Sequence, residues 1–227
     1  MNYLLLQIND ALFPIGGYSH SYGLETYIQK GIVRDSKTAR TYIHSMLLHN
    51  FCQNELLAAK LAYEFAESDR NGALEQLAGL DERITATRVA AEVRQAGEKL
   101  GSRFIKTVSG WDLPLKNKIF EEYKTIPGPK NHPVVYGVFC AGTGIEKTKM
   151  LEHYLYAQTS AAVTNCVKTV PLSQTDGQQI LFDAHDLFDK VMERLEKLGE
   201  EDLGAEAPGF EIRCMQHETL YSRLYMS

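Results

Sequence analysis

The sequence predicts an all-α fold, a single domain built as a bundle of roughly ten helices. Apolar residues recur at helical spacing through most of the 227 residues. Alternation of the β type never extends beyond a few residues, and no internal repeat or low-complexity tract divides the sequence. A chain of this length buries about 70% of its unfolded surface, so it needs no disulfide or structural metal to fold. One helical domain over residues 1–227 is therefore expected.

The first part of the chain is expected to contain several helical stretches. Pro14 should end the first of them, and Gly31 the second. Asp35 or Ser36 is a favourable N-cap for the next, because both side chains can accept a backbone N–H at a helix start. The expected helical stretches are residues 4–12, 19–30, 36–51 and 56–65.

The rest of the chain continues the helical pattern. Asn71 and Gly72 mark a turn, and Pro127–Pro133 reads as a loop. Pro171 should end one long helix, and Ser173 should cap the next. The expected helical stretches are residues 74–77, 81–108, 116–123, 134–142, 146–170 and 173–198.

The last part of the chain is expected to be a mobile linker followed by a docking tail. The linker, at about residues 199–209, is acidic and interrupted by Gly and Pro; its acids are Glu200, Glu201, Asp202 and Glu206. In residues 210–227 an apolar stripe follows helical spacing: Leu220, Tyr221, Leu224 and Tyr225. Such a stripe needs cover, either from its own bundle or from a partner.

Composition narrows the class of protein. The net charge of -5 argues against a dedicated nucleic-acid binder. The cysteines form no CxxC pair, which disfavours a disulfide framework or a zinc site; they are Cys52, Cys140, Cys166 and Cys214. The first residues lack the basic region of a signal peptide, and no apolar run is long enough to span a bilayer. We expect a cytoplasmic protein that does not bind a membrane.

Residues 10–25, DALFPIGGYSHSYGLE, are unusual for a simple connection between helices. Glycine lets the backbone turn tightly or lie close to another surface, and aromatic residues with polar tips often anchor interfaces. A helix-breaking turn with core aromatics explains the segment about equally well. Catalysis by Ser19, His20 and Ser21 is disfavoured, because adjacent side chains point in different directions.

A metal-binding or enzymatic interpretation stays open as the alternative. His49 and Cys52 are separated by three residues on a predicted helix, as are Cys214 and His217. Two ligands do not complete a metal site, and most such pairs are packing residues. The alternative protein is a helical metal carrier or a small helical enzyme that uses the region of Tyr18, His20, His49 and Cys52.

The predicted helix over residues 146–170 carries two amides near its buried stripe, Gln158 and Asn165. Buried amides need partners, which favours a hydrogen-bond network or a seam between two copies of the chain. Lys168 lies beside that stripe among small side chains, where another surface can approach closely. A solvated lysine on an ordinary amphipathic helix is an equally good interpretation.

Three separated motifs resemble those of the UreF family of urease accessory proteins. They are DALFPIGGYSHSYGLE, PLSQTDGQQIL at residues 171–181, and QHETLYSRLYMS at residues 216–227. The internal segments AEVRQAGEKLGSRF and HPVVYGVFCAGTGIE also resemble that family. The similarity covers nearly the whole chain, with the motifs in the family's order.

The resemblance implies an all-α homodimer without catalytic residues or a cofactor of its own. It implies a scaffold that bridges UreD (also called UreH) and the GTPase UreG, so that nickel enters apo-urease in a GTP-dependent step. Nickel and GTP would then be handled by the partner proteins. Matching the motifs places partner-binding residues at Tyr18, His20, Glu25, Lys168, Gln174, Asp176, His217, Tyr221 and Arg223.

Overall fold

The computed structural model describes residues 3–68, 72–205 and 208–227, and within these ranges it contains helices and no strands. Asn71 and Glu206 lie outside the described residues. The prediction of a single all-α domain is confirmed. The elements are α1 (Tyr3–Ile8), η1 (Gly17–Ser19), α2 (Leu24–Gln29), α3 (Ser36–Ser45), η2 (Met46–Leu56), α4 (Leu57–Glu67), α5 (Ala73–Thr87), α6 (Ala91–Val108), α7 (Ile119–Tyr123), α8 (His132–Gly142), α9 (Lys147–Thr169), α10 (Gln174–Glu196), η3 (Glu200–Asp202) and α11 (Pro208–His217).

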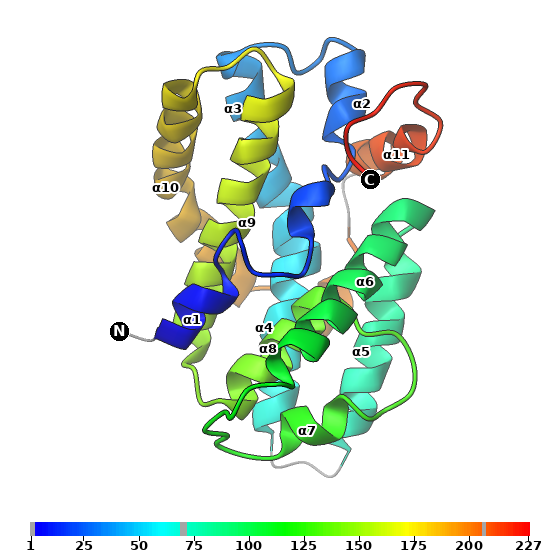
Figure 1. Cartoon of the computed structure of the whole chain (residues 1–227), viewed down its shortest axis with the longest axis vertical. Coiled ribbons are helices and arrows are strands. Elements are labelled where there is room, and N and C mark those ends of the chain that lie inside the picture. Colours follow the sequence, from blue (N-terminus) through cyan, green and yellow to red (C-terminus); the bar gives the residue numbers. More distant parts are fainter. Residues whose placement is uncertain (1–2, 69–71, 206–207) are drawn as a thin grey trace.

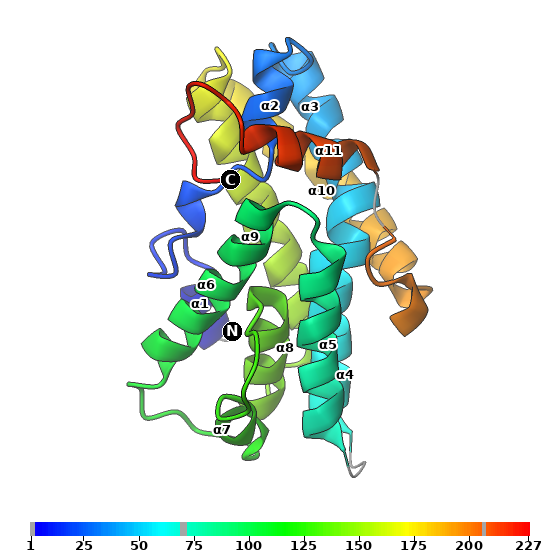
Figure 2. The same cartoon turned by 90° about the vertical axis from the view of Figure 1, so that its right-hand side faces the viewer.

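Helix α8 is the centre of the bundle, and all of its residues are buried. It packs most extensively against α4 and also against α6, and Figure 2 shows it among the surrounding helices. Gly137 permits the close approach of α4, because a Cβ there would lie 2.4 Å from the Ala59 carbonyl oxygen. The longest nearly apolar run of the sequence, residues 134–145, therefore lies mostly in this core helix. Among the described helices, none is both long and apolar enough to cross a membrane.

Both predicted N-caps form. The Asp35 carboxylate accepts the Thr38 N–H at 2.8 Å and starts α3. At the start of α10, Ser173 Oγ accepts the Asp176 N–H at 3.0 Å while the Asp176 carboxylate accepts the Ser173 N–H at 2.9 Å. The π-helical element η2 joins α3 to α4, so that residues 36–67 form one continuous helical rod.

The prediction of one helix over residues 81–108 is wrong, because residues 81–87 belong to α5 and α6 begins only at Ala91. The break between α5 and α6 lies at residues 88–90, where Arg88 is extended with φ -84° and ψ 100°. The Arg88 guanidinium enters the interior, where it pairs with Glu55 and donates to Asn131 Oδ1 at 3.1 Å. Arg94 Nη1 bonds the Arg88 carbonyl at 2.8 Å. A buried ion pair thus ends α5 where neither glycine nor proline marks a boundary.

The linker, expected to be mobile, contains a short helical turn, and the last residues, whose apolar spacing predicted a helix, are not helical. Glu200–Asp202 forms the turn η3, whose Glu200 pairs with Arg83 of α5. Helix α11 ends at His217, and residues 218–227, called the tail from here on, are not helical. Figure 1 shows the tail in red, looping from α11 across the region of α2 and the upper end of α6.

Candidate functional site

The tail returns to residues 19–22, near the other end of the sequence. The Ser21 and Tyr22 backbone N–H groups both donate to the Ser227 carbonyl oxygen, at 2.6 and 3.0 Å. Met226 N donates to the Ser19 carbonyl at 2.8 Å. The motif that contains residues 10–25 and the motif that contains the tail are therefore two halves of one structural site.

Glu25, in the first turn of α2, fixes the backbone of the tail. One carboxylate oxygen accepts the Leu224 N–H at 2.7 Å, and the other accepts the Tyr225 N–H at 2.9 Å. These two N–H groups would bond preceding carbonyls if the tail were helical. The buried carboxylate replaces those partners, which explains why the apolar spacing in the tail does not produce a helix.

His217 lies between two carboxylates and is completely buried. Its Nε2 is 3.1 Å from Glu25, and its Nδ1 is 2.8 Å from Glu92 of α6. A neutral imidazole carries one N–H, so His217 donates to both carboxylates only in the protonated form. The ring links α2, α6 and α11 at the point where the tail leaves α11.

Glu92 also binds Arg223, the tail residue implied by the family motif. Burial opposes ionisation of Glu92, but hydrogen bonds from His217 and Arg223 outweigh that effect and lower its pKa. Glu92 is a site residue that the sequence analysis missed. Its sequence signals are an acid in the first turn of a helix, which many helices carry, and its place in the family-like segment AEVRQAGEKLGSRF.

His20 holds the end of the tail from the other side. Its Nδ1 is 2.9 Å from Ser227 Oγ, and its carbonyl accepts Asn165 Nδ2 of α9 at 2.9 Å. Burial, followed by the positive charges of Arg103 and Lys99, lowers the pKa of His20. Asn165 therefore has a hydrogen-bond partner within the same chain, as the hydrogen-bond alternative expects, and the seam between two copies stays a prediction.

Gly23 shows why glycine occurs in this segment. Its φ is +81°, which disfavours other residues, and a Cβ there would lie 3.0 Å from Cys214 N of α11. The absence of a side chain at Gly23 thus allows α11 to lie close to the start of α2. The segment thus combines a turn with a close contact inside the chain, and its role toward a partner stays a prediction.

The tail exposes three large apolar side chains among polar ones. Tyr221 is fully exposed, and Leu224 and Met226 are also exposed. Tyr18 is 71% exposed, two residues before the His20 contact to Ser227. These four residues, Tyr18, Tyr221, Leu224 and Met226, are called the tail face. The polar contacts hold the segment beneath them, and the tail face is left open to solvent.

The remaining predicted partner-binding residues lie elsewhere, at the corner between α9 and α10. Lys168 and Gln174 are exposed, on either side of the short connection at residues 170–173. Asp176 already serves in the capping box of α10, and hydrogen bonds from Ser173 lower its pKa. The predicted residues therefore form two separate groups, one at the tail and one at this corner.

The structure does not bring together the residues of the metal-carrier alternative. His49 is exposed, whereas Cys52 is completely buried. Burial raises the Cys52 pKa to about 11, which keeps the thiol protonated, and the thiolate is the metal-binding form. In the other pair, both ring nitrogens of His217 already face carboxylates. Among the described residues, no group of three or more His, Cys, Asp or Glu side chains could hold a metal ion.

Fold and site together define an all-helical protein in which a C-terminal segment, fixed by two glutamate carboxylates, presents exposed apolar side chains. The family model named UreF matches residues 33–185. This chain belongs to the UreF family.

Full-length relatives agree with this assignment. The urease accessory protein UreF of Haemophilus influenzae (strain PittGG) is 37% identical over 227 residues, covering 98% of this chain and 94% of the relative. The protein of that name from Bacillus sp. (strain TB-90) is 35% identical over 224 residues, covering 98% of this chain and 97% of the relative. The one from Actinobacillus pleuropneumoniae is 34% identical, with the same coverages as the Bacillus protein.

Proposed function

We propose that this chain is a cytoplasmic, non-catalytic scaffold in urease maturation. It bridges UreD (or UreH) and the GTPase UreG, and the assembly inserts nickel into apo-urease in a GTP-dependent step. The chain holds neither nickel nor GTP as its own cofactor. Membership of the UreF family supports a role in urease maturation. The observation that carries the scaffold role is the exposed tail face, whose segment is fixed by Glu25 and Glu92.

The tail face is the proposed contact for UreD. Exposed aromatic and apolar side chains anchor protein interfaces when they are already held in place, because little ordering entropy is then lost on binding. Glu25 and Glu92 supply that order by bonding the tail backbone and Arg223. Lys168 and Gln174 form the proposed contact for UreG, on a separate part of the surface.

Two exposed substitutions test this assignment, and each serves as the control for the other. Tyr221→Ala should weaken UreD binding by more than about 30-fold, the expected loss for an interface anchor worth at least 2 kcal/mol. Once the Tyr221→Ala chain has bound UreD, this complex should recruit UreG as the wild-type complex does. Lys168→Ala should retain UreD but lose UreG and urease activation. Co-purification of the three proteins measures both effects, and loss of the same partner in both variants contradicts the assignment.

We also propose that the chain forms a homodimer, through an aromatic patch on α9 and α10. The patch consists of Tyr156, Phe182, His185 and Phe188. The His185 ring contacts the other three rings in tilted arrangements, at centroid distances of 5.5 to 6.2 Å. Phe182 is 67% exposed in the single chain. A second copy of the patch would cover these rings, and the patch is separate from the tail face.

A further inference from the structure

A cleft lies between the tail and α6. It has a volume of about 330 Å³. Its lining includes His20, Lys99 and Arg223, together with the tail residues 224–226. A second hollow, of about 410 Å³, continues along α6 toward Arg103. Both hollows share Gln95 and Lys99, so they form one trough along the exposed side of the helix. The tail forms one wall of this trough.

The trough is locally positive in a chain whose net charge is -5. The acid inside the cleft, Glu92, is already engaged, because one oxygen faces His217 and the other faces Arg223. Lys99 forms no ion pair or hydrogen bond among the described residues. The charges of Arg103 and Lys99 both contribute to the lowered pKa of His20, as expected for a positive potential at this point.

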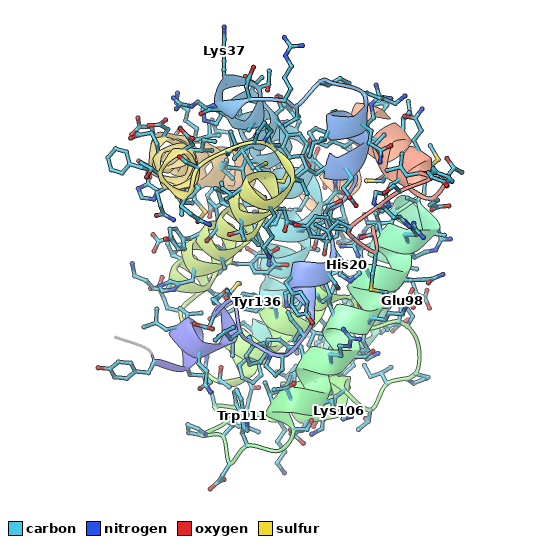
Figure 3. All side chains as sticks on the ribbon, turned by 45° about the horizontal axis from the view of Figure 1, so that its top comes forward. His20, Lys37, Glu98, Lys106, Trp111 and Tyr136 are labelled. Atoms are coloured by element: carbon cyan, nitrogen blue, oxygen red, sulfur yellow. The ribbon has the colours of Figure 1, made fainter. Side chains whose placement is uncertain are left out.

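Several N–H donors in the trough remain available. Arg223 bonds Glu92 through Nη1, and Arg103 bonds the Ile15 carbonyl at 3.0 Å through its own Nη1. A guanidinium has five N–H donors, so each arginine keeps others for a ligand. Glu98 is the acid among the residues that line the second hollow, together with Lys99 and Arg103. Figure 3 labels it on α6, with His20 beside the helix and Lys106 farther along it.

We propose that this trough binds an acidic, extended segment of a partner protein, and that binding stabilises the docked tail. Lys99 and Arg103 are four residues apart on α6, which places them about 6 Å apart along the helix axis. Alternate residues of an extended chain are about 7 Å apart, so carboxylates at alternate positions can face both cations. A carboxylate between Lys99 of α6 and Arg223 of the tail bridges the two walls.

The trough shares Leu224 and Met226 with the tail face, but its cations come from α6 and Arg223. This inference therefore goes beyond the proposed function and does not depend on which accessory protein binds there. The coupling to the tail follows from the geometry. The cleft exists only while residues 224–226 lie against α6, so a ligand that fills it favours the docked state. The Leu224 and Tyr225 amides report that state, because both donate to Glu25.

The test uses the purified full-length chain and a fluorescent synthetic peptide in which Asp alternates with Ser. A peptide with Asn in place of Asp is the uncharged control. The protein variants are Lys99→Glu and Lys37→Glu, which make the same change in net charge. Lys37 is exposed on α3, far from α6 in Figure 3. Binding is measured by fluorescence anisotropy at low salt, and tail docking by hydrogen–deuterium exchange.

Lys99→Glu should weaken binding of the Asp peptide by about fivefold or more, because an ion pair is replaced by repulsion. Lys37→Glu should change it by less than about twofold, as a remote charge is screened. The Asp peptide should slow exchange of the tail amides in the wild-type chain. The proposal is overturned by equal weakening in the two variants, by equal binding of the Asn peptide, or by unchanged exchange in the tail at saturation. None of these outcomes depends on UreD or UreG.

Discussion

Individual carboxylates in this molecule have different tasks that depend on what surrounds them. Glu25 accepts two backbone N–H groups, and Glu92 accepts two side-chain donors. Asp81 of α5 lies deeper, 1% exposed, and accepts the Tyr123 hydroxyl at 2.5 Å and the Asn131 N–H at 2.7 Å. Burial raises the Asp81 pKa to about 6 despite these hydrogen bonds. The same side-chain chemistry therefore fixes the tail in one place and makes the core sensitive to pH in another.

The Asp81 shift predicts how stability changes with pH. Its pKa in the folded state is about 6, above the unfolded value near 4, so the native state holds the proton more tightly between these limits. The free energy of unfolding should therefore fall as pH rises from about 4 to 6, by about 2 to 3 kcal/mol from this group. Urea denaturation at several pH values measures it in the wild type and in Asp81→Asn.

Asp81→Asn should be less stable overall, because an amide nitrogen would face other donors, but it should lack the decrease between pH 4 and 6. Comparing the two slopes cancels the contribution of the other carboxylates. Parallel curves for the two proteins would contradict the role given to Asp81.

Sequence analysis located residues of the site better than it located their contacts. The motifs pointed to residues 10–25 and to the tail, and these segments do meet. Glu92 went unnoticed, because it joins residues more than 100 positions away, and no local pattern encodes such a pairing. His217 was implied by the family motif, but its position between two carboxylates follows only from the packing of α2, α6 and α11.

At the scale of elements, capping and periodicity predicted the helices best where local interactions decide their ends. Asp35 and Ser173 start α3 and α10 as expected. The break at residues 88–90 depends instead on the buried partners of Arg88, which come from distant parts of the chain. The tail loses its helical spacing for the same reason, because Glu25 takes its backbone N–H groups. Local patterns therefore fail where long-range polar contacts compete.

Packing between α4 and α8 provides a prediction at this scale. Gly137→Ala should destabilise the protein by about 1 to 3 kcal/mol, because the new Cβ would lie 2.4 Å from the Ala59 carbonyl oxygen and a backbone must shift. Gly79→Ala in α5 is the matched control, since no atom lies within 4 Å of its added Cβ. The control should gain about 0.5 to 1 kcal/mol from helix propensity. Thermal unfolding measures both variants, and a stable Gly137→Ala would show that α4 and α8 can separate freely.

The whole molecule distributes its exposed features over separate surfaces. The tail face and the trough lie near α6, the corner with Lys168 lies between α9 and α10, and the aromatic patch lies along α9 and α10. Periodicity predicted one helical domain, but it could not separate these surfaces. The trough and the aromatic patch combine residues that are adjacent only after folding. A scaffold needs such separation, because partners that share a surface would compete instead of assembling.

The proposed homodimer is a property of the whole molecule and can be tested without any partner. Phe182→Ser should weaken dimerisation by more than about 30-fold, because an aromatic anchor at the centre of an interface contributes at least about 2 kcal/mol. Leu12→Ser is the control, since Leu12 is 89% exposed and is not one of the four residues of the patch. Sedimentation velocity over a range of concentrations should give a monomer for Phe182→Ser and a dimer for Leu12→Ser and the wild type. Circular dichroism establishes that both variants keep their helical content. A wild-type chain that stays monomeric contradicts the homodimer. A Phe182→Ser variant that dimerises as the wild type does places the contact outside the aromatic patch.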